Sequence, residues 1–221
     1  MRLLALETAT RRLSVALWLD GQVQERDLDS PTGGSEWLLP TARALLADAG
    51  VALTDLDGLA FGRGPGAFTG LRLAAGCVQG LAFGLDLPVI GISSLEALAE
   101  ASGESKVYAC LDARMHEVYV AAYLDGIEVM TPTVVAPAMA PVPPGDGWVG
   151  CGDAFAGYPS DLPRFERTRS GLLPTAVAVA RLAAARWSSA NRLSAGDAIP
   201  MYVRNRVALT TAERVARGGV R

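Results

Sequence analysis

The sequence predicts an α/β fold in which mixed β-sheets are flanked by helices, and two observations carry this prediction. The first hundred residues read as three strands followed by a helix, a strand, a helix, a strand and a helix. Tight turns join the early strands, which indicates antiparallel pairing, whereas helices between the later strands indicate parallel pairing. After a polar break at Ala101–Ser105, three strand-like segments recur. The second half thus restarts with the opening pattern, which hints at a duplication.

Hydrophobic periodicity and turn residues place each element. In the first half we expect strands at Arg2–Leu6, Leu13–Leu19, Gln22–Leu28, Leu56–Gly62 and Leu87–Ile92, and helices at Ser35–Ala49, Phe68–Leu85 and Ser94–Ala101. In the second half we expect strands at Val107–Ala113, Glu117–Leu124, Ile127–Val135 and Trp148–Gly152, and a helix at Thr175–Trp187. Pro40 lies just past the first turn of its helix, which predicts a late start or a kink. The polar break predicts a domain boundary between 1–101 and 102–221, with the last segment returning to the first lobe.

The composition excludes several function classes. Of the 221 residues 50% are hydrophobic and 19% are charged, which suits a folded chain with a sizeable core. Twenty basic residues against 23 acidic ones give a net charge of -3, which argues against a freestanding nucleic-acid binder. Only one histidine, His116, and three widely spaced cysteines are present, so neither a zinc site nor a metalloprotease motif can be assembled. We predict no catalytic constellation and no metal site.

The same inventory bears on location. Cys77, Cys110 and Cys151 form an odd, sparse set that favours reduced thiols and a cytoplasmic protein. The start of the chain reaches Glu7 too soon for a signal-peptide core. The longest uncharged helical run, Leu73–Leu85, is shorter than the roughly 18 residues that span a membrane. We therefore expect a cytoplasmic protein without a membrane segment.

A polar turn between the first two strands is the first candidate site. Glu7, Thr8 and Thr10 combine a carboxylate with two hydroxyls, which could face a phosphate or its magnesium ion. The alternative is an ordinary turn whose hydroxyls bond to their own backbone. The Gly62–Gly70 segment precedes a helix, where backbone amides can bind an anion, but it matches neither a P-loop nor a dinucleotide fingerprint.

The helix predicted at Phe68–Leu85 is the second candidate site. Its apolar side chains form one stripe, and Gly76, Gly80 and Gly84 recur on another face beside Leu73 and Cys77. Each glycine costs about 1 kcal/mol relative to alanine within a helix, so close packing should offset three of them. In the helix predicted at Ser35–Ala49, the apolar side chains likewise occupy more of the surface than one stripe. A second surface should cover both helices, either from this chain or from a partner.

Five segments together resemble the bacterial TsaB family, also called YeaZ. These segments are LLALETAT at 3–10, GRGPGAFTGLR at 62–72, PVIGISSL at 88–95, LDARMHEVY at 111–119 and PMYVRN at 200–205. The resemblance spans nearly the whole chain and is weakest from 130 to 190. The 62–72 and 111–119 segments are the most specific.

The resemblance implies an actin/Hsp70/sugar-kinase-like fold with two ribonuclease-H-like lobes, the second of them reduced. It implies a non-catalytic subunit of the complex that transfers a threonylcarbamoyl group to adenosine next to the anticodon of tRNA. The family pairs with the catalytic subunit TsaD, the ATPase TsaE joins, and a homodimer forms when the partner is absent. The resemblance thus implies tRNA contact only through the complex. No cofactor is expected on this chain alone, and ATP or ADP at the partner interface stays open.

The resemblance also assigns the partner surface to the first two helices. The partner-binding residues it implies are Trp37, Leu38, Thr41, Leu45, Thr69, Leu73, Gly76, Cys77, Gly80 and Gly84. Two positions depart from the family pattern. Glu7 stands where an aspartate is usual, which weakens a magnesium role, and the 33–36 segment lacks a histidine that relatives often carry. The competing hypothesis is a small ATP-dependent phosphotransferase of the same fold acting as a homodimer, with Glu7, Thr8 and Thr10 at its nucleotide site.

Overall fold

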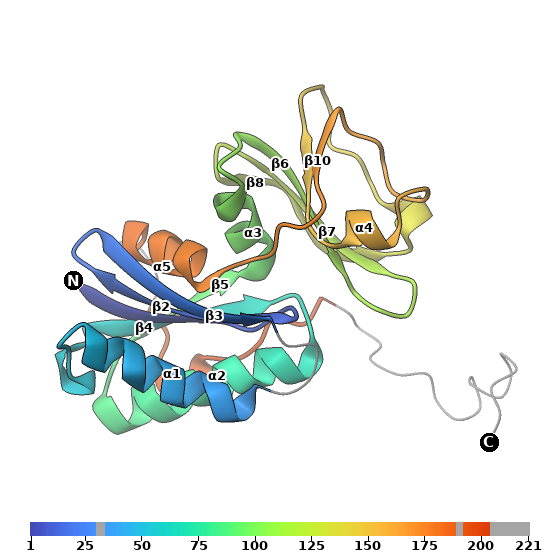
Figure 1. The fold of residues 1–221 in the computed structure, drawn as a ribbon. Helices are drawn as coiled ribbons and strands as arrows, with labels where there is room; N and C mark the ends of the chain where they lie inside the picture. Colours follow the sequence, from blue (N-terminus) through green and yellow to red (C-terminus); the bar gives the residue numbers. More distant parts are fainter. Residues whose placement is uncertain (30–33, 189–191, 204–221) are drawn as a thin grey trace, which may run out of the picture.

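Two five-stranded mixed sheets, one in each half of the chain, form the framework of the protein (Figure 1). The computed structural model describes residues 1–29, 34–188 and 192–203. The first sheet has the order β3-β2-β1-β4-β5 and the second has the order β10-β9-β6-β7-β8. Each sheet begins with an antiparallel meander of three strands, so the predicted mixed α/β fold with two lobes is confirmed.

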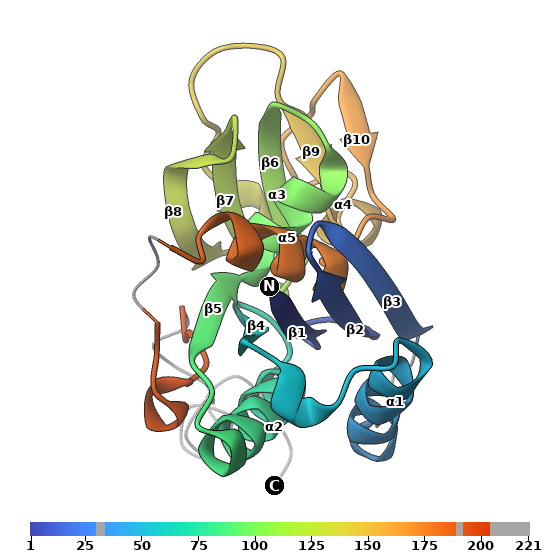
Figure 2. The same cartoon turned by 90° about the vertical axis from the view of Figure 1, so that its left-hand side faces the viewer.

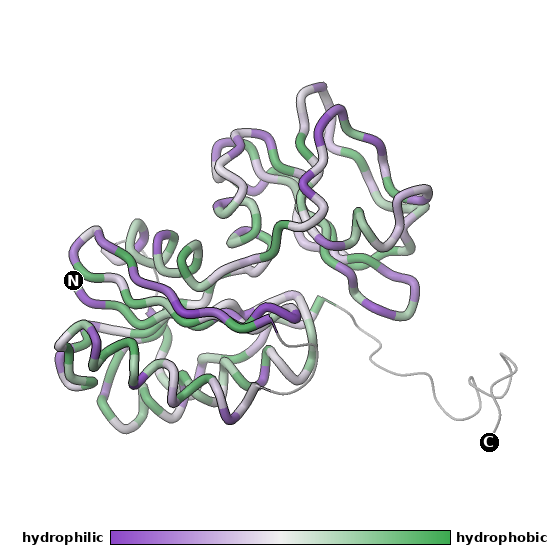
Figure 3. The backbone as a smooth tube through the Cα atoms, viewed as in Figure 1, coloured by the Kyte–Doolittle hydropathy of each residue, from purple (hydrophilic) through white to green (hydrophobic). Residues whose placement is uncertain are grey.

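The first sheet is built as the sequence pattern predicts. Its strands are β1 Arg2–Glu7, β2 Arg12–Leu19, β3 Gln22–Asp29, β4 Gly58–Gly64 and β5 Val89–Ser93. The first three pair antiparallel, and β4 pairs parallel to both β1 and β5. Strands β1 and β2 are almost wholly buried, whereas β3 alternates between exposed and half-buried residues at the sheet edge. Figure 3 shows β3 as a largely hydrophilic strand beside hydrophobic ones.

Helices cover both faces of the first sheet. Helix α1, Ser35–Asp48, and helix α2, Phe68–Leu85, lie on one face and bury a common apolar core against it. Helix α5, Ala176–Ala185, comes from the second half of the chain and packs on the opposite face against β1 and β2. Figure 2 shows α1 and α2 on the same side of the sheet with α5 on the other.

The second lobe has a less regular build. Its strands are β6 Lys106–Asp112, β7 Val118–Leu124, β8 Ile127–Val135, β9 Val149–Cys151 and β10 Arg167–Arg169. Helix α3, Ser94–Ser102, covers one face and contributes to the core with Leu95 and Leu98. The short helix α4, Ala154–Gly157, lies over the other face, where Tyr108, Phe155 and Phe165 pack as tilted and edge-on rings. Two three-residue strands and a four-residue helix make this the reduced lobe.

The late helix start predicted from Pro40 is wrong, and the kink stays a prediction. Helix α1 begins at Ser35 and continues through Pro40 to Asp48. A proline at the sixth helical position lacks the amide that would bond to the Glu36 carbonyl, and its ring crowds that carbonyl. Both residues are exposed, so water can bond to the carbonyl instead. The prediction also missed β10, α4 and three single-turn 3-10 helices, namely Leu53–Asp55, Pro137–Met139 and η3 at Ala195–Asp197.

Helix α2 is long and apolar enough to cross a membrane by length and composition alone. In the fold it packs its apolar stripe, Leu71, Ala74, Ala75, Val78 and Ala82, into the core beneath β4. On its flank, Gln79 donates a side-chain hydrogen bond of 3.1 Å to the Ala198 carbonyl, beside η3. One stripe of the helix is thus buried in the folded lobe, and one such helix is weak evidence for a membrane span.

Candidate functional site

An open cleft of about 710 Å³ lies between the lobes. One wall comes from the β1–β2 turn and the start of α2, and the other comes from the end of β6 and the β6–β7 hairpin. Thr8 and Thr10 line this cleft, together with Thr69 of α2. Both threonines of the first candidate site therefore lie at this cleft, and their role in binding a nucleotide stays a prediction.

Glu7 lies behind the cleft, and its side chain is completely buried. Its Oε1 accepts a hydrogen bond of 2.7 Å from the Ala9 amide, and its Oε2 accepts one of 2.9 Å from the Ser94 hydroxyl. The glycine at Gly62 leaves room for this carboxyl group, because a Cβ there would lie 1.9 Å from Oε2. The carboxyl group thus ties β1 to its own turn and to the start of α3, and the prediction that it faces a phosphate or magnesium ion is wrong.

Burial sets the protonation of Glu7. Removal from water raises the pKa of this carboxyl group above its ordinary value of 4.5, and hydrogen bonds from Ala9, Ser94 and the Thr8 amide oppose the rise. The folded protein therefore binds a proton more tightly than the unfolded chain. The protonated Glu7 side chain therefore stabilises the fold below pH 4.5. This stabilisation is lost as the pH rises through the raised pKa that Glu7 has in the folded protein.

We expect Glu7→Gln to remove this pH dependence. The amide keeps the shape and stays neutral, so the variant should unfold like the wild type near pH 4 and be more stable at pH 8. Urea unfolding across that range measures the effect, with exposed Glu100→Gln as the control. If the free energy of unfolding varies with pH in the same way for the wild type and Glu7→Gln, then folding does not raise the pKa of Glu7.

Both hydroxyls of the turn take part in hydrogen bonds within the chain. Thr8 is fully buried, and its Oγ1 donates to the Gly70 carbonyl at 2.7 Å. Thr10 accepts a hydrogen bond of 3.3 Å from the Arg12 amide. The turn also presses on the start of α2, where the Ala67 amide donates to the Ala9 carbonyl at 2.7 Å. Thr10 thus follows the ordinary-turn alternative, whereas Thr8 bonds to the backbone of α2 instead of its own turn. One of the amides that would bind an anion already has a backbone partner.

Two aspartates on the opposite wall were missed by the sequence reasoning. Asp112 ends β6 and accepts from the Arg114 amide at 2.8 Å and from the Tyr158 hydroxyl at 3.3 Å. Asp153 accepts a 3.0 Å hydrogen bond from the Asp112 amide, and burial raises the pKa of its carboxyl group. The signal was present in the 111–119 segment, but Asp153 lies 41 residues away and no local pattern connects the two. In the described ranges no three metal-ligating side chains gather.

His116 is at the surface, whereas two of the three cysteines are buried. His116 is exposed at the hairpin tip, where its ring meets Tyr158 edge-on at 5.2 Å. Cys110 and Cys151 are buried, and burial raises the pKa of Cys151 to about 11. Neither thiol is poised as a nucleophile at neutral pH.

The predicted partner-binding residues fall into two groups. Thr69, Gly76, Gly80 and Gly84 are exposed, and the half-buried ones are Trp37, Thr41, Leu73 and Cys77. Leu38 and Leu45 have no exposed surface, because they point into the core beneath the first sheet. Their assignment to the partner surface is therefore wrong. Of the two consecutive leucines in α1, Leu38 is buried in the core and Leu39 is exposed.

The glycines of α2 face open space. A Cβ built on Gly76, Gly80 or Gly84 would meet nothing within 4 Å. Phe83 lies beside them with 86% of its surface exposed. The sequence reasoning missed Phe83, although its position next to the glycine stripe was a usable signal. This exposed face, defined by Gly76, Gly80, Phe83 and Gly84, is called the glycine face below.

Comparison with known proteins identifies the relatives of this chain. The family model "TsaD: tRNA N6-adenosine threonylcarbamoyltransferase" matches residues 33–141. The "tRNA threonylcarbamoyladenosine biosynthesis protein TsaB" of Escherichia coli K12 is 37% identical over 94% of this chain and 96% of its own length. The protein of the same name from Haemophilus influenzae is 36% identical over 94% of this chain and 95% of its own length.

A solved structure agrees with these sequence matches. "YeaZ from Pseudomonas aeruginosa" superposes with a TM-score of 0.85 at 40% identity, over 91% of this chain and 99% of that one. A second structure from Pseudomonas aeruginosa, titled "an uncharacterized protein with similarity to peptidase YEAZ", gives 0.87 at 40% identity, over 92% and 99%.

The two mixed sheets and the cleft between them define a protein of the actin/Hsp70/sugar-kinase-like class with a reduced second lobe. The near-full-length matches go further. The chain belongs to the TsaB (YeaZ) family of proteins named for threonylcarbamoyladenosine biosynthesis in tRNA.

Proposed function

We propose that this chain is a non-catalytic, cytoplasmic subunit of the complex that transfers a threonylcarbamoyl group to adenosine next to the anticodon of tRNA. It pairs with a TsaD-like catalytic subunit through the exposed faces of α1 and α2, and a TsaE-like ATPase joins the pair. Without the partner the same face forms a homodimer. Family membership and the match of a TsaD family model to residues 33–141 support this role.

The glycine face carries the proposal. Three glycines within α2 cost about 1 kcal/mol each relative to alanine. Close packing inside the chain does not offset this cost, because each glycine faces open space. A smooth helix surface with an almost fully exposed phenylalanine is typical of a site where another helix approaches closely. Trp37 of α1 and Leu73 of α2 pack against one apolar core and stay partly open to a partner.

The cleft supports a non-catalytic role. Its two threonines and one helix-start amide are bonded within the chain, and Glu7 lies behind the turn. We therefore place no resident nucleotide in this chain alone. An ATP or ADP would need groups from a partner, which puts any such site at the subunit interface.

Gly80→Leu tests the interface. The side chain would enter open space on the free protein, so the fold should keep its stability or gain about 1 kcal/mol from better helix propensity. In the complex the added bulk should weaken binding to the TsaD-like subunit at least tenfold. Thermal unfolding of the free variant measures its stability, and titration calorimetry with the purified subunits measures its affinity for the partner. Gly157→Leu, which also faces open space but lies in α4, is the matched control. Wild-type affinity for Gly80→Leu would place the interface elsewhere.

The alternative is a homodimeric ATP-dependent phosphotransferase, and the open inter-lobe cleft is the observation that favours it. This alternative predicts magnesium-dependent ATP hydrolysis or phosphotransfer by the isolated chain, weakened by Asp153→Asn at the cleft wall. A turnover rate equal to that of buffer removes the alternative. Turnover that survives purification of the chain and falls in the variant would overturn the non-catalytic role.

A further inference from the structure

The mouth of the inter-lobe cleft carries an exposed aromatic and arginine cluster. Phe68 at the start of α2 and Tyr202 near the end of the described chain are each 49% exposed. Their ring centroids lie 6.3 Å apart at an interplanar angle of 42°. The Arg72 guanidinium lies 3.2 Å from the Phe68 centroid and 5.4 Å from the Tyr202 centroid. We call these three residues the stacking cluster.

The chain return that forms this cluster is fixed by backbone hydrogen bonds. Leu193 exchanges two backbone hydrogen bonds with Val89, and the Met201 amide donates to the Arg63 carbonyl at 2.7 Å. Tyr202 is therefore held against the start of α2. In the described ranges Arg72 makes no ion pair, so its charge is available at the surface.

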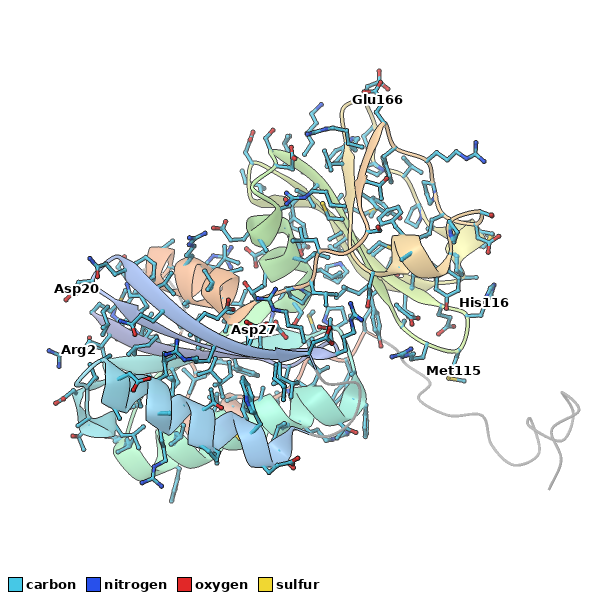
Figure 4. All side chains as sticks on the ribbon, viewed as in Figure 1. Arg2, Asp20, Asp27, Met115, His116 and Glu166 are labelled. Carbon is cyan, nitrogen blue, oxygen red and sulfur yellow. The ribbon has the colours of Figure 1, made fainter. Side chains whose placement is uncertain are left out.

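The tip of the β6–β7 hairpin lines the same cleft from the opposite lobe. Met115 is 63% exposed, and it lines the cleft together with Arg114. Arg114, Met115 and His116 all have left-handed backbone angles, with φ of 61°, 55° and 57°. Non-glycine residues rarely adopt this conformation, and runs of it concentrate at functional sites. Figure 4 shows Met115 and His116 projecting at this tip.

We propose that the stacking cluster binds a single-stranded stretch of the RNA substrate, with a base stacked on Tyr202 or Phe68 and a phosphate at Arg72. The inference rests on the proposed role in tRNA modification. Exposed aromatic rings beside arginine form the usual platform for unpaired bases, because every base offers a π face.

The acidic groups near the cluster limit the affinity. Asp112 forms an ion pair of 3.2 Å with Arg114, and the nearby Asp153 has a raised pKa. With a net charge of -3 for the whole chain, binding should be weak and strongly dependent on salt. A local cluster thus supplies contacts within a larger complex and does not make the chain a freestanding RNA-binding protein.

Fluorescence anisotropy of a labelled twelve-nucleotide adenylate RNA with the full chain at low salt tests the proposal. Tyr202→Ala should weaken binding about tenfold, since one stacked base is lost. Arg72→Gln should weaken binding and lower the slope of log affinity against log salt by about 0.7, the value for one contact to a single strand. Met139→Ala, also exposed, and Arg192→Gln, which stacks on Trp187 at 4.9 Å, are controls that should bind as the wild type does.

The experiment distinguishes RNA binding by the stacking cluster from binding of the TsaD-like subunit. The same variants are titrated with the TsaD-like subunit, and RNA binding is repeated with that subunit present. Weakened RNA binding with unchanged partner affinity supports the stacking cluster, even if the partner proves to bind elsewhere. Wild-type RNA affinity in Tyr202→Ala and Arg72→Gln, or no RNA binding by the wild type alone and with the partner, overturns it. Loss of protein association with unchanged RNA binding would make the cluster a protein-docking surface and also overturn it.

Discussion

Phe83→Asp should abolish association with the TsaD-like subunit, with a loss of affinity of at least 100-fold. Phe83 is 86% exposed, so the free protein should fold normally. A buried aromatic anchor at the centre of an interface is worth about 2–4 kcal/mol, and an unpaired carboxylate in its place adds a desolvation cost. Calorimetry of the two purified subunits measures the loss, and circular dichroism checks the fold.

Met139→Asp is the matched control for this prediction. Met139 is 74% exposed in the second lobe, so the variant adds the same charge at a similar exposed position away from α2. It should bind as the wild type does. Equal affinity of Phe83→Asp and Met139→Asp would show that the glycine face is not the partner surface.

Gly70→Ala should lower the free energy of unfolding by about 3 kcal/mol, although it adds only one methyl group. A Cβ at Gly70 would lie 2.0 Å from the Thr8 carbonyl oxygen, which is backbone and cannot rotate away. Either the β1–β2 turn or the start of α2 must shift, at a cost typical of an overpacked core. For a chain of this size the melting temperature should fall by about 6–12 °C.

Gly80→Ala in the same helix should have the opposite sign. Its Cβ enters open space, so the gain in helix propensity is about 1 kcal/mol and the melting temperature should rise by a few degrees. Thermal unfolding of both variants measures the contrast. A neutral Gly70→Ala would mean that the turn does not press on α2 as the structure has it.

The fold was largely predictable because its signals are local. Apolar runs identified β1 and β2, weak alternation identified β3, and helical periodicity located Phe68–Leu85 to the residue. Boundaries shifted by one or two residues elsewhere, because strand ends depend on pairing partners. The short β10 and α4 have too few residues for a pattern, and their place depends on packing against β9 and β6.

The candidate site was only partly predictable, because side-chain direction depends on the assembled fold. The sequence identified Glu7 as an acidic turn residue, but only the packing of β1 beside β4 and α3 turns its carboxyl group inward. Leu38 and Leu45 share a helix with Trp37 but face the core. Asp153 and Asp112 are far apart in the sequence and meet only in the folded chain. The same is true of Tyr202 and Phe68.

Hydrogen–deuterium exchange of the purified chain, alone and mixed with the TsaD-like subunit, tests the central claim most directly. The chain has a single lysine, so amine cross-linking would report little, whereas exchange covers every peptide. The account predicts slower exchange confined to peptides of 37–49 and 68–84 when the partner is added, with the second lobe unchanged. No protection, or protection confined to the second lobe, would contradict it.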